Sequence, residues 1–315
     1  MANTGANSKN NANPTAIVIP HAVVIIPARF ASSRLPGKAL LEIDGKPMVC
    51  RVADQALAAK NVSRVIVATD DQRIIDAVEV AGHEAVMTRA DHRSGTDRLA
   101  EVAATLDDAD IIVNVQGDEP LISPKTIDRA IEALVGRDCG IPEQKKRSLL
   151  DTGKGSGKSI GKRDEDLTVE RAGIVTTWER IESIKDVLNP AVVKVVVDET
   201  GRAIYFSRAP VPFPQSAVIK HGTIENALQN EPSLLDTFRK HTGLYVYSKK
   251  VLLEFSSWPQ SKLERIESLE QLRALEHGVK ITAIEAASPS IGVDTFEDLE
   301  RVRNMVSSFE VRVSS

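Results

Sequence analysis

Short apolar runs alternate with helical patterns along most of the chain. Four runs are apolar on both faces, which is typical of buried parallel strands. They are AVVIIP (22–27), RVIVAT (64–69), IIVNVQ (111–116) and AVVKVVVD (191–198). Apolar residues at helical spacing predict helices at 46–60, 71–80, 94–106 and 123–135. Strands that alternate with helices form βαβ units, so the pattern predicts an α/β fold with a mostly parallel sheet flanked by helices.

Two stretches interrupt this rhythm. Residues 140–166 are charged, rich in Gly, Ser and Lys, and without periodicity, so we expect an exposed loop there. Residues 212–236 hold three prolines and look irregular.

Within the first stretch, GKGSGKS (153–159) is similar to a P-loop, but three residues separate its outer glycines where the motif needs four, and no strand precedes it. We therefore do not expect a nucleotide site at this segment.

Composition and charge narrow the class of protein. Among 315 residues, 40 Lys and Arg stand against 44 Asp and Glu, so the net charge of −4 gives no reason to expect a nucleic-acid or anionic-membrane partner. Only two cysteines occur, Cys50 and Cys139, which fits a reducing compartment, and we expect a cytoplasmic protein. Residues 1–20 do not resemble a signal peptide, and no run approaches the roughly 18 apolar residues of a membrane span.

Ligands of parallel sheets bind beyond the carboxyl ends of the strands, so the turns after residues 27, 69 and 116 are the first places to look for chemistry. The first turn carries three cations, Arg29, Arg34 and Lys38, around Gly37. Cations on a loop of small residues can surround a triphosphate. A solvated basic loop explains the same spacing equally well.

Two aspartates are candidate magnesium ligands. Asp118 follows an apolar strand directly, and Mg²⁺ favours one or two carboxylates together with phosphate oxygens. Asp118 could instead cap the helix that starts near Ser123. Asp294, in the segment GVDTFED (292–298), could be a second ligand or the N-cap of a helix at 295–307.

Two helices carry further polar candidates. Ser94 and Gly95 stand at a helix start, where free N–H groups bind anions, although Ser94 with Asp97 also forms a reasonable capping box. A helix over 261–278 would place acidic and amide residues on one face, opposite Ile266, Leu269 and Leu272. That polar face comprises Glu264, Glu267, Glu270 and Gln271. By itself such a face is usually solvated.

Taken together, the motifs closely resemble those of the CMP-KDO synthetases, the cytidylyltransferases of 3-deoxy-D-manno-octulosonate (KDO). The matching segments run in family order over most of 22–303. They are VVIIPARFASSRLPGKALLEIDGKPM (23–48), IVATDD (66–71), MTRADHRSGTDRLAEV (87–102), IIVNVQGDEPLI (111–122), NPAVVKVV (189–196), YFSRAPVP (205–212), KHTGLYVY (240–247), LERIESLEQLRALEHG (263–278) and GVDTFEDLERV (292–302).

The resemblance implies a Rossmann-like nucleotidyltransferase fold and transfer of CMP from CTP to KDO for the lipopolysaccharide inner core, with Mg²⁺ as cofactor. Positioning and electrostatics dominate catalysis of this kind. By resemblance, Arg29 and Lys38 hold the triphosphate and share the catalytic work with Asp118. The cytidine and substrate pocket would include Ser94, Gly95 and Gln116, and the metal would be bound by Asp118 and Asp294.

The sugar side implied by the resemblance comprises Arg208, His241, Tyr245, Glu270 and Gln271, with Arg208 as partner of the sugar carboxylate. His241 would be a hydrogen-bonding contact, although a purely structural histidine is the alternative. The implied organisation has a disordered extension at 1–20, a cytidylyltransferase domain at 21–303 and a tail at 304–315. Within the domain lie an exposed insertion at 137–170 and an inserted sugar-side region at 198–250 that also forms a homodimer.

Two residues depart from the family pattern beside substrate motifs: Val246 replaces the usual Gly and Lys262 the usual Pro. Acceptor choice is therefore less firmly implied than cytidylyl transfer. An 8-amino analogue of KDO and sialic acid stay open as acceptors. A catalytically silent nucleotide-binding scaffold is the alternative from a different class, with residues 137–170 as its interaction segment.

Overall fold

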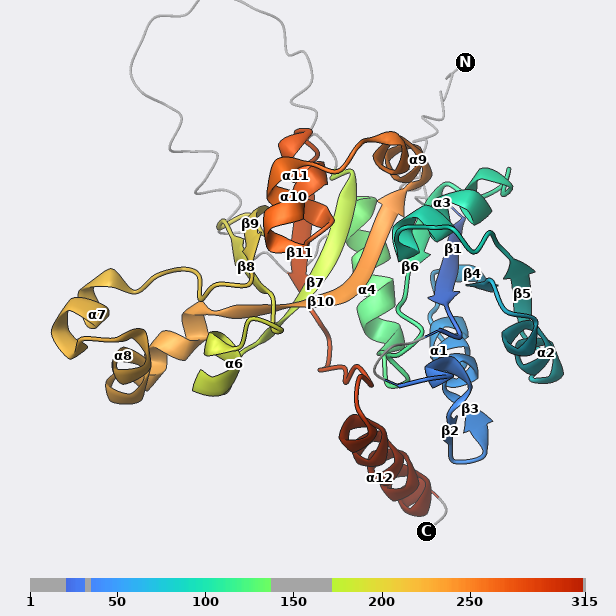
Figure 1. Ribbon diagram of the computed structural model, residues 1–315, viewed down its shortest axis with the longest axis horizontal. Coiled ribbons are helices and arrows are strands. Elements are labelled where there is room, and N and C mark those ends of the chain that lie inside the picture. The colour runs from blue at the N-terminus through green and yellow to red at the C-terminus, as the bar shows by residue number, and fades with distance from the viewer. Residues whose placement is uncertain (1–20, 32–34, 137–171, 314–315) are drawn as a thin grey trace, which may run out of the picture.

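A nine-stranded sheet forms the centre of the computed structural model, which describes residues 21–31, 35–136 and 172–313 (Figure 1). The strands of this sheet are β1 (Ala22–Ala28), β4 (Val62–Thr69), β5 (Glu84–Met87), β6 (Ile111–Asn114), β7 (Ile174–Arg180), β8 (Lys194–Val197), β9 (Ala203–Ser207), β10 (Arg239–Ser248) and β11 (Ile281–Glu285). Seven of them lie in the order β11-β7-β10-β6-β1-β4-β5, and β8 pairs with β10 and β9. A separate small hairpin joins β2 (Glu42–Ile43) to β3 (Lys46–Pro47).

The main path of the sheet runs in one direction except for one strand. Strand β1 is parallel to β4 and β6, β4 is parallel to β5, and β7 is parallel to β11. Strand β10 is antiparallel to both β6 and β7. The predicted mostly parallel sheet is therefore confirmed. The prediction of a parallel strand at 191–198 is wrong, because β8 is antiparallel to both β9 and β10.

Helices cover both faces of the sheet. The helices are α1 (Met48–Leu57), α2 (Gln72–Val80), α3 (Gly95–Ala104), α4 (Pro124–Leu134), α6 (Ile184–Leu188), α7 (Gln215–His221), α8 (Ile224–Asn230), α9 (Lys249–Ser257), α10 (Lys262–Glu267), α11 (Gln271–Glu276) and α12 (Phe296–Val313). Val24 and Ile26 of β1 pack with α1, α2 and α4, whereas Val23 and Ile25 pack with α3, α9 and α11. This alternation gives β1 two buried faces, as its apolar sequence predicted.

The predicted helix over 261–278 is in fact two short helices. Ser268 adopts a left-handed conformation, with φ 53°, and ends α10 before α11 begins. The solvated face that periodicity alone would suggest is not found at Glu264, which is 3% exposed and whose Oε1 accepts a hydrogen bond from Arg273 at 3.0 Å. Ile266, expected on the apolar side, is 68% exposed. Periodicity could not foresee that an arginine nine residues later would pair with Glu264 inside the protein.

The ends of the sheet-and-helix core carry two additional units. The stretch 212–236, expected to be irregular, contains α7 and α8, which stand away from the sheet beyond α6 (Figure 1). Helix α12 packs its Leu299 and Val302 against Ile43 of the hairpin and continues to Val313, past the expected end at 307 and into the tail expected from 304. The predicted extension at 1–20 and insertion at 137–170 lie outside the described residues. No helix within the described ranges has both the length and the apolar content to cross a bilayer.

Candidate active site

Lys38 lies between the two carboxylates that the sequence predicts as metal ligands. Its Nζ is 2.5 Å from Oδ2 of Asp118 and 3.2 Å from Oδ1 of Asp294. The backbone N–H of Val293 donates to the carbonyl of Asp118 at 2.9 Å and holds the two acidic loops together. Gly37, at φ 67°, turns the chain so that the 3₁₀ helix η1 (Lys38–Leu40) begins at the lysine. Three residues far apart in the sequence thus converge on one point.

Neither aspartate is engaged as a helix cap. The hydroxyl of Thr295 accepts a hydrogen bond from the N–H of Asp298 at 3.1 Å, and Oδ2 of Asp298 accepts from the N–H of Thr295 at 2.9 Å. This reciprocal pair caps α12, so the N-cap interpretation of Asp294 is wrong. At α4, the N-cap residue is Ser123. The carboxylates of Asp118 and Asp294 instead face a cation.

The first turn connects the basic residues to the start of α3. Nη2 of Arg29 donates to the carbonyl oxygen of His92 at 2.7 Å. The ring of Phe30 lies between Gly37, whose missing Cβ would meet it at 3.3 Å, and the guanidinium of Arg73, 3.3 Å from the ring centroid. The turn is therefore packed on both sides of Phe30. Arg34, the third predicted cation, lies outside the described residues.

A cavity of about 340 Å³ opens at the start of α3. Ser94 caps this helix, since its Oγ accepts from the N–H of Asp97 at 3.2 Å, which confirms the Ser94 half of the predicted capping box. Six of the predicted nucleotide and sugar residues line the cavity: Ser94, Gly95, Gln116, Tyr245, Glu270 and Gln271.

The direction of β10 explains why these residues meet. Because β10 runs against β6 and β7, its first half lies beside their carboxyl ends, and Tyr245 stands opposite Asn114. The pairing of β10 with β7 shifts between Thr242 and Tyr245. A bulge of this kind re-aims the strand. At the bulge, a Cβ on Gly243 would lie 2.9 Å from Cγ of Gln116, so only glycine lets the two segments approach this closely.

His241 is a neutral hydrogen-bonding residue. Its Nε2 is 3.0 Å from Oγ1 of Thr176, and that hydroxyl donates its proton to the carbonyl of Leu244 at 2.8 Å. The hydroxyl has one proton, so Nε2 of His241 must be the donor and Nδ1 is left as an acceptor. Burial among Phe206 and Tyr245, with ring centroids at 5.1 and 5.3 Å, lowers the pKa of His241 to about 3.

Glu270 and Gln271 follow the turn between α10 and α11. A carboxylate oxygen of Glu270 accepts from the hydroxyl of Thr96 at 2.7 Å, which ties α11 to α3. Gln271 is 7% exposed, and its Nε2 has no hydrogen-bond partner among the residues that the structure describes. A buried donor without an acceptor is costly, and a ligand oxygen would satisfy it.

Arg208, the predicted partner of a sugar carboxylate, is outside the lining of this cavity. Its side chain instead donates to backbone carbonyls, those of Glu267 at 2.7 Å, Pro190 at 3.0 Å and Ser268 at 3.3 Å. A guanidinium has five N–H groups, so two are left over from these bonds. Arg208 thus borders the turn that leads to Glu270.

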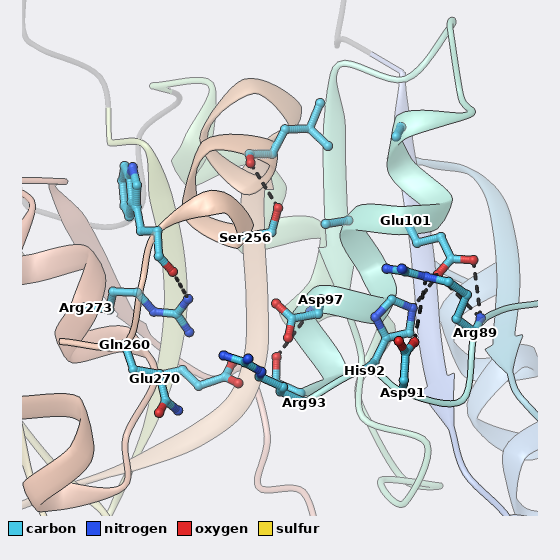
Figure 2. Close-up of a pocket in the computed structure, with 15 residues that line it drawn as sticks. Arg89, Asp91, His92, Arg93, Asp97, Glu101, Ser256, Gln260, Glu270 and Arg273 are labelled. Atoms are coloured by element: carbon cyan, nitrogen blue, oxygen red, sulfur yellow. Dashed lines mark hydrogen bonds and ion pairs between the residues drawn. The ribbon is translucent and has the colours of Figure 1, made fainter.

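Several residues of the cavity wall were not predicted from the sequence. Asn114 and Thr96 belong to motifs that were recognised, and Asn114 is a buried polar residue in an otherwise apolar strand, which is a signal that could have identified it. Arg93 lines this cavity and a larger one of about 730 Å³ beside it, shown in Figure 2. The larger cavity lies between the segment of His92 and Glu101 and that of Gln260 and Arg273.

The two residues that depart from the family pattern do not line the 340 Å³ cavity. Val246 is fully buried, stands opposite Val113 and Val175, and belongs to the apolar core. Lys262 is the first residue of α10, directly after the Ser261 N-cap. Proline is favoured at that first helical position and lysine is tolerated there, so the exchange has a local explanation.

Comparison with known proteins places the chain in a family. Residues 23–281 match the cytidylyltransferase family model. A 3-deoxy-manno-octulosonate cytidylyltransferase of Trichlorobacter lovleyi is 46% identical over 281 residues, 89% of this chain and 96% of that protein. One of Yersinia enterocolitica is 43% identical over 284 residues, with 89% and 96% coverage.

Solved structures agree with the sequence relatives. A structure of CMP:2-keto-3-deoxy-manno-octonic acid synthetase complexed with CTP matches with a TM-score of 0.70 and 38% identity, over 91% of this chain and 99% of that one. A 4-diphosphocytidyl-2C-methyl-D-erythritol synthase of Anaerococcus prevotii, at 13% identity, 91% and 99% coverage and a TM-score of 0.53, shares the fold. The chain therefore belongs to the cytidylyltransferase family, as a member of its 3-deoxy-manno-octulosonate cytidylyltransferase group.

Proposed function

We propose that this enzyme transfers CMP from CTP to KDO and releases pyrophosphate, forming the CMP-KDO used for the lipopolysaccharide inner core. The observation that carries the proposal is that one cavity is lined by three members of each predicted set, Ser94, Gly95 and Gln116 for the nucleotide and Tyr245, Glu270 and Gln271 for the sugar. Substrates that react directly must bind side by side. In the proposed step the anomeric hydroxyl of the sugar attacks the α-phosphorus in line.

The phosphate side is assigned to the basic turn. Arg29 and Lys38 would offset the charge of the triphosphate, because cations placed before the reaction stabilise charge that moves between phosphate oxygens. Arg29 has N–H groups beyond the one bonded to His92, and Lys38 stands at the same end of the sheet as Asp118.

Mg²⁺ fits the acidic pair as cofactor. Asp118 and Asp294 both reach the same ammonium nitrogen, so their carboxylates converge as those of a shared cation site do. Bound there, Mg²⁺ would neutralise phosphate charge and polarise a phosphoryl oxygen. Mg²⁺ favours one or two carboxylates together with phosphate oxygens and water, which is the donor set that this pair and a bound triphosphate would supply.

The acceptor side suits a hydroxyl-rich sugar acid. Gln271 offers a donor without a partner among the described residues. Neutral His241 does not itself line the cavity, but its ring lies beside that of Tyr245, which does, and its Nδ1 is assigned as an acceptor. Arg208 is assigned to the sugar carboxylate through the N–H groups that its three carbonyl bonds leave over. These contacts would hold the anomeric hydroxyl toward the nucleotide.

Pyrophosphate release by the purified protein tests the assignment. We would supply Mg²⁺ with each of the four nucleoside triphosphates and with KDO, 8-amino-KDO or sialic acid in parallel. Release with CTP and KDO alone is the expected result. Release with CTP and another sugar would keep the transfer but overturn the proposed acceptor, and no release in any combination would overturn the function.

We further propose a homodimer in the cytoplasm, with residues 198–250 as the dimerisation region. Within this region, Phe213 is 60% and Ile219 is 76% exposed, around α7 and away from the core sheet. Exposed apolar side chains of this size favour an interface. Light scattering coupled to size exclusion would give twice the chain mass if the region pairs, and cell fractionation would test the location.

A further inference from the structure

Lys194 is a lysine with no exposed surface. Its Nζ donates to three backbone carbonyls, those of Val192 at 2.6 Å, Arg208 at 2.7 Å and Asn189 at 3.1 Å. An ammonium has three N–H donors, so each one has an acceptor. Burying a charge in this way is costly, and the residue must contribute something that an apolar side chain of the same length could not.

One of the three carbonyls that Lys194 binds belongs to Arg208, and the side chain of Arg208 extends the hydrogen-bond network. Its guanidinium donates to the carbonyls of Glu267, Ser268 and Pro190. Its backbone N–H donates to Oε2 of Glu267 at 2.9 Å, and the hydroxyl of Ser207 donates to Oε1 of the same carboxylate at 2.7 Å. Two cations therefore fix the end of β9 against the turn at 267–268.

That turn decides where the predicted sugar residues point. Ser268 has φ 53°, a conformation that a non-glycine residue adopts only when its surroundings hold it there. Glu270 and Gln271 follow directly and line the cavity, together with Ser268 and Leu269. A shift of the turn would therefore move both polar groups relative to the acceptor.

We propose that Lys194 is a positioning residue for acceptor binding, which holds Arg208 and the 267–268 turn so that Glu270 and Gln271 face the sugar. This inference rests on the proposed function, since it assumes that the cavity takes the acceptor there. Lys194 itself does not line the cavity. Substitution of Lys194 should therefore change the KM for the acceptor and leave the binding of CTP unchanged.

The test measures pyrophosphate release by the full-length Lys194→Met enzyme with Mg²⁺, varying KDO at saturating CTP and then CTP at saturating KDO. Methionine is unbranched and only one atom shorter than lysine, and it removes all three donors. Because a displacement of about 1 Å can cost on the order of 100-fold in rate, we expect the KM for KDO to rise at least about tenfold. The KM for CTP should stay within about twofold, since the nucleotide residues are not in this network. Equal rises in both constants, or no rise for KDO, would overturn the role.

A matched control separates positioning from loss of stability. Val78 of α2 is also fully buried, but it packs in the core cluster of Val24 and Ile26, which includes no residue of the Lys194 network. Val78→Ala should lower the melting temperature and leave both KM values unchanged. If Lys194→Met does not fold, Lys194→Gln, which keeps two donors, takes its place. Its KM for KDO should rise above the wild-type value, but by less than the rise of about tenfold expected for Lys194→Met.

Gln271→Ala keeps this inference distinct from the proposed function. If Gln271→Ala raises the KM for KDO and the Lys194 variants do not, the sugar site stands and the positioning role is wrong. If neither Gln271→Ala nor the Lys194 variants change that KM, the proposed sugar site and the positioning role both fall. A rise with both substitutions supports both.

Discussion

Nζ of Lys38 lies 2.5 Å from Oδ2 of Asp118, although 80 residues separate them in the sequence. The same nitrogen is 3.2 Å from the carboxylate of Asp294. The lysine proposed to bind phosphate thus lies beside the two aspartates proposed to bind the metal. In nucleotide enzymes the phosphates bind magnesium directly, so a phosphate-binding cation and metal-binding carboxylates are expected next to each other.

Asp118→Asn should reduce turnover at least about 100-fold, the scale lost with one key electrostatic group. The amide cannot replace the charge of the carboxylate toward a cation, while its similar shape should leave the melting temperature nearly unchanged. Pyrophosphate release at limiting Mg²⁺ measures the effect. Asp54→Asn is the matched control, because Asp54 also pairs with a lysine, Lys46, at 2.5 Å but lies elsewhere. Near wild-type turnover for Asp118→Asn would remove its metal role.

Gly243→Ala should impair catalysis by displacing Gln116. The new Cβ would lie 2.9 Å from Cγ of Gln116, too close for two carbon atoms, and 3.1 Å from Oε1 of Glu119, which is a tight contact. We expect a loss in kcat/KM of up to about 100-fold, as misplaced substrate groups cost that much. Gly292→Ala provides the comparison, since no atom of the described residues, apart from its two chain neighbours, lies within 4 Å of its Cβ position. Equal activities of the two variants would mean that the close approach at the bulge has no functional role.

Asp70→Ala should cost about 3 to 5 kcal/mol in the free energy of unfolding. Arg98 is fully buried and donates to Oδ2 of Asp70 at 2.8 Å, so the substitution leaves a buried charge without its counter-ion. Urea denaturation measures the change. Glu84→Ala breaks the pair of Glu84 with Arg64, whose side chains are 39% and 42% exposed, and should cost no more than about 1 kcal/mol. A similar loss of unfolding free energy in both variants would contradict the prediction that the buried ion pair stabilises the fold more than the exposed one.

Stability should fall with rising pH because of Glu119. Burial raises the pKa of Glu119 to about 7, from an ordinary value of 4.5, and the neighbouring charges of Asp118 and Glu179 raise it further. A hydrogen bond from Ser290 and the charge of Lys240 act in the opposite direction and lower it. Between these pH values the folded protein keeps a proton that the unfolded chain has released. The free energy of unfolding therefore decreases as pH rises through this window, by on the order of 3 kcal/mol.

Glu119→Gln supplies the reference for that measurement. The amide does not titrate, so the wild type should lose stability relative to the variant between pH 4.5 and 7 in metal-free buffer. Denaturation at several pH values gives the difference directly. A difference independent of pH would show that Glu119 titrates normally in the folded protein.

Local sequence patterns predicted the elements that depend on neighbouring residues. The apolar runs at 22–27, 64–69 and 111–116 are strands, and the predicted Ser94 cap begins α3. These features follow from alternation, spacing and capping, which act within a few residues. The run at 191–198 was assigned to a parallel strand because periodicity reports burial but not the direction of the neighbouring strand.

The same limit explains the helix predicted over 261–278. Whether Glu264 faces water depends on Arg273 and on the chain that covers them, and the break at Ser268 coincides with the carbonyls held by Arg208. Neither partner can be identified from spacing. Recognised motifs supplied the candidate site residues, but only the structure could bring six of them into the lining of one cavity.

The sequence by itself determined the buried strands and the starts of several helices, because each depends on contacts between near neighbours, and its motifs supplied the residue types of the site. Tertiary structure decided which of those residues meet. The reversed direction of β10 brings Tyr245 beside Asn114, and the loops of Asp118 and Asp294 join at Lys38. These long-range contacts depend on the order and register of the strands, which are set by the packing of the whole chain.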